Sequence, residues 1–244
     1  MNSKRPARLV LLLLSILLVG LFLAGCSLLD APPNPPPAAA DPPATPADPP
    51  PADPPPADPP KEIGGLVDVT ALDPTLVVDL RYATADNFTG KKIYSEAKCL
   101  LLRPTAERLA EANKEFATLG YRIKVWDAYR PLSAQQTLWD VVSDRTFVAD
   151  PKKGSIHNRG AAVDVTLVDK DGKELPMPTG FDDFSEKAGI KYAGCTEEQA
   201  ANRELLATIM VKHGFSRYEA EWWHFADTES SSFPLLDVQF DEFK

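Results

Sequence analysis

Two short segments in the C-terminal half carry side chains suited to binding a metal ion and activating water. One starts at Ser155 and reads Ser-Ile-His-Asn-Arg-Gly-Ala-Ala-Val-Asp, and the other starts at Glu221 and reads Glu-Trp-Trp-His. They supply His157, Asp164 and His224, and the chain has only three histidines in all. Two imidazole nitrogens and one carboxylate oxygen suit a catalytic zinc ion, which keeps a fourth position for water. Glu221 is then available to accept a proton from that water.

The spacing of these residues sets conditions on the backbone. His157 and Asp164 are seven residues apart, too far for one helical turn, so the loop around Gly160 must turn His157 back toward Asp164 on the following strand. Glu221 and His224 are three residues apart and would face opposite sides of a regular strand. We therefore expect His224 on a strand and Glu221 on the turn before it.

Asp164 lies in an apolar run, where a carboxylate is costly to bury unless it is paired or binds a metal. On a strand it shares one face with Ala162 and Thr166, which are small enough to leave room for an ion. The aliphatic residues between them would pack the opposite, core side. A salt bridge explains Asp164 equally well on its own, but the nearby His157 favours the metal.

The elements that must position these residues follow from periodicity and end signals. We expect helices from Leu102 to Gly120, from Ser133 through Val142, and from a capping box at Thr196 to Gly214. Strands are expected over residues 121–126, 161–168 and 221–225. Because helices and strands alternate without a regular period, residues 63–244 predict one α+β domain with a mostly antiparallel central sheet flanked by helices. His213 stands at a helix end, where a structural role is expected.

The N-terminus reads as a targeting signal. Three basic residues precede an apolar run that ends at Leu-Ala-Gly-Cys, which resembles a bacterial lipobox. Residues 1–25 are therefore expected to be a lipoprotein signal peptide, and Cys26 to carry the lipid. The alternative is a transmembrane anchor that is not cleaved. Since Ser27 follows Cys26 in place of the aspartate linked to inner-membrane retention, we expect an exported protein anchored on the periplasmic side, on the outer membrane more than on the inner one.

Residues 26–62 are expected to be a disordered tether rich in Pro, Ala and Asp. Residues 32–60 hold 16 of the 24 prolines, a composition that forms no core and favours an extended polyproline II spacer.

Charge excludes some partners. Cleavage after residue 25 would remove three positive charges and no negative charge, which changes the net charge from −9 to −12. An acidic surface of this kind argues against binding nucleic acid or anionic lipid headgroups, so membrane contact is expected through the lipid anchor alone. No obligate protein partner is implied.

Two cysteines remain after lipidation of Cys26. Export permits a disulfide, and we expect a bridge between Cys99 and Cys195, with two buried thiols as the alternative.

The two segments resemble the zinc D-alanyl-D-alanine dipeptidases of the vancomycin-resistance type. The matching pattern is Ser155-x-His157-x6-Asp164 with Glu221-x-Trp223-His224. It is accompanied by Tyr-Ala-Thr-Ala-Asp-Asn-Phe-Thr-Gly over residues 82–90 and Trp-Asp-Ala-Tyr-Arg-Pro over residues 126–131. The resemblance covers most of residues 66–227. It implies the Hedgehog-like fold of the wider zinc DD-peptidases.

This resemblance also implies roles for single residues. It makes His157, Asp164 and His224 the ligands of one zinc ion, and Glu221 the general base and acid. Arg130 would stabilise the oxyanion of the substrate, and Asp127 would orient Arg130. The further positions that it implies for holding the substrate, including its free ammonium group, are Ser155 and Asp182, with Asp183 as the alternative to Asp182.

The function implied is zinc-dependent hydrolysis of the small dipeptide D-alanyl-D-alanine to two D-alanines. Export would separate this enzyme from a cytoplasmic dipeptide pool, so we expect a role in cell-wall peptide turnover or D-alanine salvage. Two alternatives remain: a DD- or LD-carboxypeptidase acting on peptidoglycan stem peptides, and a non-catalytic peptidoglycan-binding module.

Overall fold

The computed structural model describes residues 59–243. The expected signal peptide, the lipid site at Cys26 and the tether up to residue 58 lie outside the described residues. Within residues 59–243, none of the helices combines the length and the apolar character needed to cross a bilayer.

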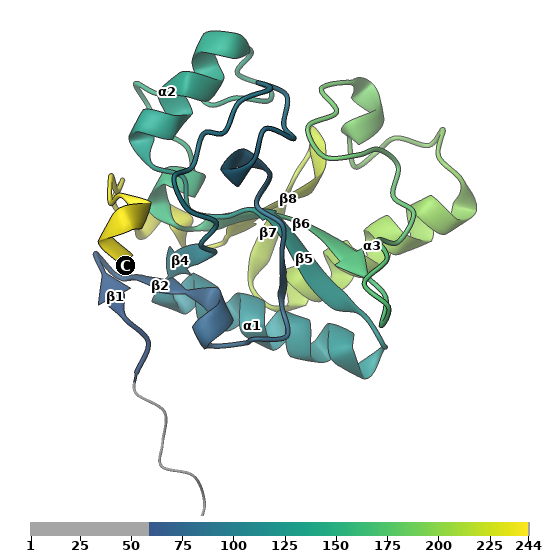
Figure 1. The fold of residues 1–244 in the computed structure, drawn as a ribbon. Helices are drawn as coiled ribbons and strands as arrows, with labels where there is room; N and C mark the ends of the chain where they lie inside the picture. Colours follow the sequence, from purple (N-terminus) through teal and green to yellow (C-terminus); the bar gives the residue numbers. More distant parts are fainter. Residues whose placement is uncertain (1–58, 244) are drawn as a thin grey trace, which may run out of the picture. The chain divides into compact units, whose positions relative to one another are not determined.

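The described chain forms eight strands, three α-helices and several short 3-10 turns (Figure 1). The strands are β1 Glu62–Ile63, β2 Leu66–Asp68, β3 Val77–Val78, β4 Leu100–Leu102, β5 Arg122–Asp127, β6 Ala162–Val168, β7 Phe215–Tyr218 and β8 Glu221–Asp227. The helices are α1 Arg103–Thr118, α2 Leu132–Val141 and α3 Glu197–Lys212. The helices and strands expected from periodicity are all present, with ends shifted by no more than two residues.

The strands form two sheets. The order in the larger sheet is β3-β5-β6-β8-β7, and only the β3–β5 pair is parallel. The smaller sheet, β1-β2-β4, is antiparallel throughout. The predicted α+β class with a mostly antiparallel central sheet is confirmed.

One face of the larger sheet is packed by α1 and α3, which Figure 1 shows side by side beneath the strands. On β6, Val163, Val165 and Leu167 belong to this main core, as predicted from their alternation with Asp164. Asp164 is thereby directed to the opposite face. That face is also covered, because every residue of β6 is buried.

The ends of α3 follow the sequence signals. Thr196 accepts a hydrogen bond from the backbone N–H of Gln199, and the Gln199 side chain accepts one from the backbone N–H of Thr196, which completes the predicted capping box. At the other end, His213 contacts Glu115 through Nε2 at 2.8 Å. This contact with α1 agrees with the structural role expected for His213.

A bulge in β5 redirects one side chain. Val125 pairs with Val165, but the next pair is Asp127 with Asp164, so Trp126 has no partner on β6. In a regular strand Asp127 would face the same side as Val125. The extra residue turns it to the face that carries Asp164.

A larger irregularity lies in β8. Arg217 of β7 pairs with Phe225, and Tyr218 pairs with Glu221, so the three residues from Trp222 to His224 have no partner on β7. Glu221 is the first residue of β8 and does not belong to the preceding turn, contrary to the expectation from spacing. The irregular backbone lets Glu221 and His224 line the same cavity despite their separation of three residues.

The expected disulfide between Cys99 and Cys195 is wrong, because both cysteines are free. Cys99 is buried in the main core, and this burial raises the pKa of its thiol. Cys195 lies in the loop before α3, where its thiol donates a hydrogen bond to the carbonyl of Tyr192 at 3.6 Å. The two thiols therefore lie in different parts of the fold. The prediction rested only on the even number of cysteines, which does not show where the fold places them.

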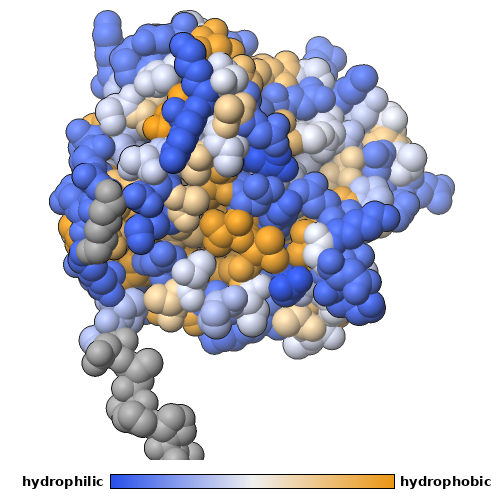
Figure 2. All heavy atoms as spheres, in the orientation of Figure 1, coloured by the Kyte–Doolittle hydropathy of each residue, from blue (hydrophilic) through white to orange (hydrophobic). Residues whose placement is uncertain are grey.

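Hydrophilic residues cover most of the face in Figure 2, and the apolar residues on it gather mainly in one patch near its middle. The large side chains that are fully buried are mostly aromatic or aliphatic, including Trp222, Trp223 and Phe116. Hydrophobic burial therefore provides the main stabilisation of the fold.

Gly160 is a position where glycine is required. Its φ is +61°, and an added Cβ would lie 2.9 Å from the backbone nitrogen of Leu102 and 2.6 Å from Leu66 Cδ2. We predict that Gly160→Ala lowers the free energy of unfolding by about 2–4 kcal/mol, from backbone strain plus the clash. Gly172→Ala is the matched control, since its φ is +82° but no atom lies within 4 Å of the added Cβ. Urea denaturation of both variants measures the difference, and equal losses would contradict the close approach.

Candidate metal centre

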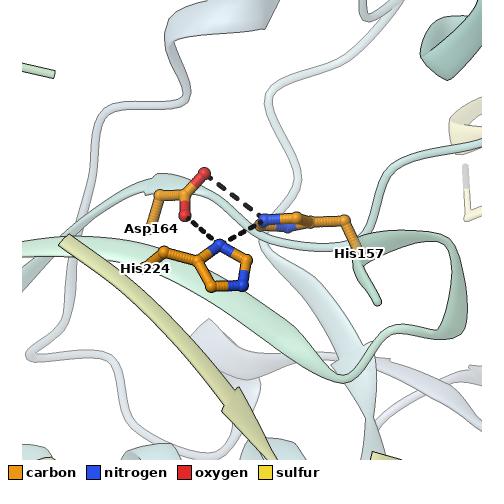
Figure 3. Close-up of side chains that lie close together, drawn as sticks. All are labelled: His157, Asp164 and His224. Carbon is orange, nitrogen blue, oxygen red and sulfur yellow. Dashed lines mark hydrogen bonds and ion pairs between the residues drawn. The ribbon is translucent and has the colours of Figure 1, made fainter. Parts of the chain in front are cut away.

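Three side chains from distant segments converge on one point (Figure 3). The distance from His157 Nε2 to His224 Nδ1 is 3.3 Å, and that to Asp164 Oδ2 is 3.4 Å. His224 Nδ1 lies 2.9 Å from Asp164 Oδ1. Among residues 59–243, these three form the one group of His, Cys, Asp or Glu side chains with the spacing of a metal site.

These distances fit a tetrahedral ion. Metal–ligand bonds of about 2.0–2.1 Å with tetrahedral angles place the ligand atoms roughly 3.3–3.4 Å apart. The separation of the two histidine nitrogens and that of His157 Nε2 from Asp164 Oδ2 agree with this range, whereas the 2.9 Å contact of His224 Nδ1 is with the other oxygen of Asp164. The donor set of two imidazoles and one carboxylate is the kind that zinc-like ions use in catalytic sites.

The register of the larger sheet produces this convergence. Asp164 of β6 pairs directly with His224 of β8, and on its other side it pairs with Asp127 of β5. Opposite residues in an antiparallel pair lie on the same face with their Cβ atoms about 5 Å apart. One row across three strands therefore carries Asp127, Asp164 and His224.

His157 reaches the row from outside the sheet. It opens a short 3-10 turn, His157–Arg159, which ends at Gly160. Its Nδ1 lies 2.7 Å from the backbone carbonyl of Ala128, which fixes the ring and leaves Nε2 to face Asp164. A second hydrogen bond of this kind on the far nitrogen is the usual way that proteins orient a metal-binding histidine.

The three residues influence one another's ionisation. Burial acts to raise the pKa of Asp164, but the imidazoles of His157 and His224 outweigh burial and hold that pKa below its usual value. Burial lowers the pKa of His224, and Asp164 only partly offsets this. For His157 burial is again opposed by Asp164, and the pKa is raised. The carboxylate is thus ionised and available as a ligand.

Glu221 lies beside the group without belonging to it. Its Oε2 is 3.9 Å from His224 Nδ1, and the residue is 7% exposed. Burial, followed by the charges of Asp164 and Asp182, raises its pKa well above the usual value. A carboxyl group with a raised pKa next to a metal site is suited to both accepting and returning a proton.

Arg130 is held by a buried network. Its Nη2 and Nε donate to Asp127 Oδ2 at 2.6 and 3.1 Å, and its Nη1 donates to Gln135 Oε1 at 2.8 Å. Asp127 also accepts a hydrogen bond from the Tyr94 hydroxyl at 2.6 Å. The guanidinium carbon lies 5.3 Å from the ring centre of Tyr82. The expected orientation of Arg130 by Asp127 agrees with this geometry.

The segments that carry Arg130 and His157 are joined by hydrogen bonds. The backbone N–H of Arg130 donates to the carbonyl of His157 at 3.1 Å, and the Asn158 side chain donates to the carbonyl of Arg130 at 2.7 Å. Asn158 also accepts a hydrogen bond from the backbone N–H of Ser155. Ser155 lines the same cavity as the metal group, and its hydroxyl accepts the N–H of His157.

Asp182 forms another part of the cavity wall. Both of its carboxylate oxygens lie within 3.2 Å of the Tyr82 hydroxyl. Its φ of +57° is unusual for a residue other than glycine, and its side chain lines the cavity. Burial, and then the charge of Asp164, raises its pKa to about 8. Asp183 does not line the cavity, and its side chain accepts a hydrogen bond from the backbone N–H of Ser185.

A cavity of about 240 Å³ contains all of these groups. Asp164, His157, His224, Glu221, Arg130, Asp182 and Ser155 all line it, and Asp127 supports it from behind Arg130. The structure therefore brings together the residues that the sequence analysis assigned to the site, with Asp182 and not its alternative Asp183 at the cavity.

Several contributing residues were not identified from the sequence. Tyr94 and Gln135 complete the network around Arg130. Tyr82 belongs to the matching segment 82–90 but was given no role, and it holds Asp182. Buried polar side chains are uninformative in sequence alone, and Gln135 lies on α2 whereas Arg130 precedes this helix. The segment 145–149, which lines the cavity, carries no motif that could have indicated it.

Comparison with known proteins gives one family. Residues 62–244 match the D-ala-D-ala dipeptidase family of peptidases. The chain is 40% identical over 178 residues to the D-alanyl-D-alanine dipeptidase of Escherichia coli, covering 73% of this chain and 92% of that protein. It is 34% identical over 168 residues to the D-alanyl-D-alanine dipeptidase of Enterococcus faecium, covering 60% of this chain and 83% of that protein.

Two further similarities are more distant. The D-alanyl-D-alanine dipeptidase of Streptomyces coelicolor is 32% identical over 187 residues, covering 67% of this chain and 90% of that protein. The solved structure of the LdcB LD-carboxypeptidase overlaps with a TM-score of 0.41 and 16% identity, covering 75% of this chain and 78% of that chain. This overlap is too weak to distinguish between substrates.

We predict that His224→Ala abolishes metal binding, because two ligands cannot hold the ion as three do. Metal analysis after dialysis should give about one equivalent per chain for the unmodified protein and almost none for the variant. His213→Ala is the matched control, since His213 contacts Glu115 and does not line the cavity. Retention of metal by the His224 variant would exclude this group as the metal centre.

Proposed function

We propose that this protein is a zinc metallopeptidase that hydrolyses D-alanyl-D-alanine to two molecules of D-alanine. The proposal proceeds from the family, since the chain belongs to the D-ala-D-ala dipeptidase family. The observation that carries the proposal is the convergence of His157, Asp164 and His224 within a cavity that also contains Glu221 and Arg130. The identity and coverage of the curated dipeptidases support the substrate.

Zinc is the proposed metal, with His157, Asp164 and His224 as its ligands. The donor set and the separations of the ligand atoms support it. A zinc ion supplies Lewis acidity, which lowers the pKa of water to about 7 and polarises a carbonyl group.

Glu221 is the proposed general base and acid. It accepts a proton from the attacking water and returns it to the amine of the leaving D-alanine, so that it ends the cycle as it began. Its position supports this exchange, because its buried carboxyl group lies beside the metal group, with Oε2 3.9 Å from His224 Nδ1.

Arg130 is proposed to stabilise the negative charge that develops on the carbonyl oxygen. It is 6% exposed and is fixed by Asp127 and Gln135, so its guanidinium need not reorganise during the reaction. Removing a comparable donor typically costs about 2.7–4 kcal/mol of transition-state stabilisation.

Asp182 is proposed to hold the free ammonium group of the dipeptide, with Ser155 as a further polar contact. Asp182 lines the cavity and is not required for the metal group, and the Tyr82 hydroxyl holds it in place. An ammonium group beside it would favour the ionised carboxylate despite the raised pKa.

We also propose an exported location with a lipid at Cys26 and a proline-rich tether that keeps the enzyme away from the membrane. The lipobox-like sequence and the 16 prolines of residues 32–60 support this. An exported dipeptidase would act in cell-wall peptide turnover or D-alanine salvage, because the cytoplasmic dipeptide pool is out of its reach.

We predict that the zinc-loaded protein releases D-alanine from D-alanyl-D-alanine and that Glu221→Gln lowers kcat by about 10²–10⁴-fold while zinc remains bound. A coupled D-alanine assay and metal analysis measure both quantities. Unchanged turnover would remove Glu221 from the mechanism. Cleavage of a stem pentapeptide, with the free dipeptide left intact, would instead favour a DD- or LD-carboxypeptidase.

We predict that the lipid anchor depends on a single residue. In a bacterial host, metabolic labelling with a fatty acid should mark the full-length protein, and Cys26→Ser should abolish the label and release the enzyme from the membrane fraction. Membrane retention of the unlabelled variant would favour an uncleaved transmembrane anchor.

A further inference from the structure

Of the positively charged side chains that line the cavity, one is paired with other residues of the site and one is available to bind substrate. Two lining residues carry a permanent positive charge, Arg130 and Arg145. Arg130 is engaged by Asp127 and Gln135 beside the metal group. Arg145 has no role in the site described so far, and 68% of its side chain is exposed.

A free dipeptide carries an ammonium group at one end and a carboxylate at the other. The proposed function assigns Asp182 to the ammonium group and assigns no partner to the carboxylate. A carboxylate taken out of water without a cationic or hydrogen-bonding partner would weaken binding. A guanidinium is well suited to it, because it donates two parallel hydrogen bonds to both oxygens.

The topology places Arg145 at the appropriate end of the cavity. Asp182 contacts Tyr82, which follows β3, and its neighbour Phe181 packs against Trp126 of β5. The metal group lies on β6 and β8, in the middle of the sheet order β3-β5-β6-β8-β7. Next to Arg145, the carbonyl of Thr146 accepts a hydrogen bond from Tyr218 of β7, at the far edge.

Residues 145–149 line the cavity and contact both of these sides. The Tyr218 hydroxyl holds Thr146 at 2.8 Å, and the ring of Tyr218 lies 5.7 Å from that of His224. Further along the segment, Phe147 packs on Phe184, with ring centres 5.0 Å apart. Arg145 precedes Thr146, so it lies toward the β7 edge, while the segment continues toward the loop that carries Asp182.

The Arg145 side chain is itself positioned. Its Nη2 donates to Asp150 Oδ2 at 2.8 Å, and the Asp150 side chain is only 13% exposed. The other oxygen of Asp150 accepts the backbone N–H of Lys152. Because only Nη2 is engaged there, the remaining N–H groups of the guanidinium stay available to a ligand.

We propose that Arg145 binds the α-carboxylate of the dipeptide. It would thereby select substrates that are two residues long, with a free ammonium group on the first residue and a free carboxylate on the second. The inference rests on the proposed dipeptidase function. Asp182 and Arg145 then mark the two ends of the substrate, and the scissile carbonyl lies between them beside Arg130 and Glu221. Asp150 is a positioning residue for Arg145.

The test compares D-alanyl-D-alanine with D-alanyl-D-alaninamide, which lacks the carboxylate charge. We expect the unmodified enzyme to prefer the acid, and Arg145→Met to raise KM for the acid about 10–100-fold with little change in kcat. The kcat/KM for the amide should change less than about threefold. Arg145→Lys should restore part of the preference, because a point charge attracts the carboxylate without bidentate geometry.

Lys153→Met is the matched control, since it removes one positive charge from the same loop without touching the cavity. It should leave both substrates unaffected. Equal losses on acid and amide in Arg145→Met, or no loss on either, would overturn the inference, as would an unmodified enzyme that does not distinguish acid from amide.

Binding to the zinc-loaded Glu221→Gln protein, measured by calorimetry, separates this inference from the proposed function. Affinity for the acid that depends on Arg145, without turnover by the unmodified protein, would overturn the dipeptidase proposal and support the carboxylate site. Turnover of the dipeptide, together with an affinity that does not depend on Arg145, would support the dipeptidase proposal and overturn the carboxylate site.

Discussion

The buried negative charge of Asp164 is the constraint on which the rest of the site depends. Asp127, Asp164 and Glu221 are all nearly inaccessible to solvent, and Asp182 faces the same cavity, while Arg130 is the one buried guanidinium among the residues that line it. A carboxylate without compensation is costly in such surroundings. The arrangement is balanced if Arg130 neutralises Asp127 and a divalent cation between the two imidazoles neutralises Asp164, which leaves Glu221 free to exchange protons.

The sheet register and two local irregularities place these charged side chains next to one another. Pairing across β5, β6 and β8 sets Asp127, Asp164 and His224 side by side. The bulge at Trp126 is needed for the first of these, and the unpaired stretch before Phe225 brings Glu221 to the same side as His224. Bulges of this kind are frequent next to active sites because they re-aim a side chain without ending the strand.

The sequence was sufficient for the parts of the site that depend on residue type and short-range order. The metal group followed from three donors of the right chemistry and from the loop at Gly160, which was expected to turn His157 back toward Asp164. The way in which Glu221 and His224 reach the same side of β8 could not be predicted, because it depends on irregular pairing with β7. The disulfide failed for a related reason, since counting two cysteines says nothing of where the fold places Cys99 and Cys195.

The central claim is that His157, Asp164 and His224 hold one zinc ion while Glu221 stays outside its coordination sphere. Anomalous X-ray diffraction at the zinc edge, from crystals of the zinc-loaded protein, tests this most directly. The account predicts a single peak within about 2.0–2.2 Å of His157 Nε2, His224 Nδ1 and an Asp164 oxygen, with Glu221 too distant to bond. A peak elsewhere, or one bonded to Glu221 in place of Asp164, would contradict it.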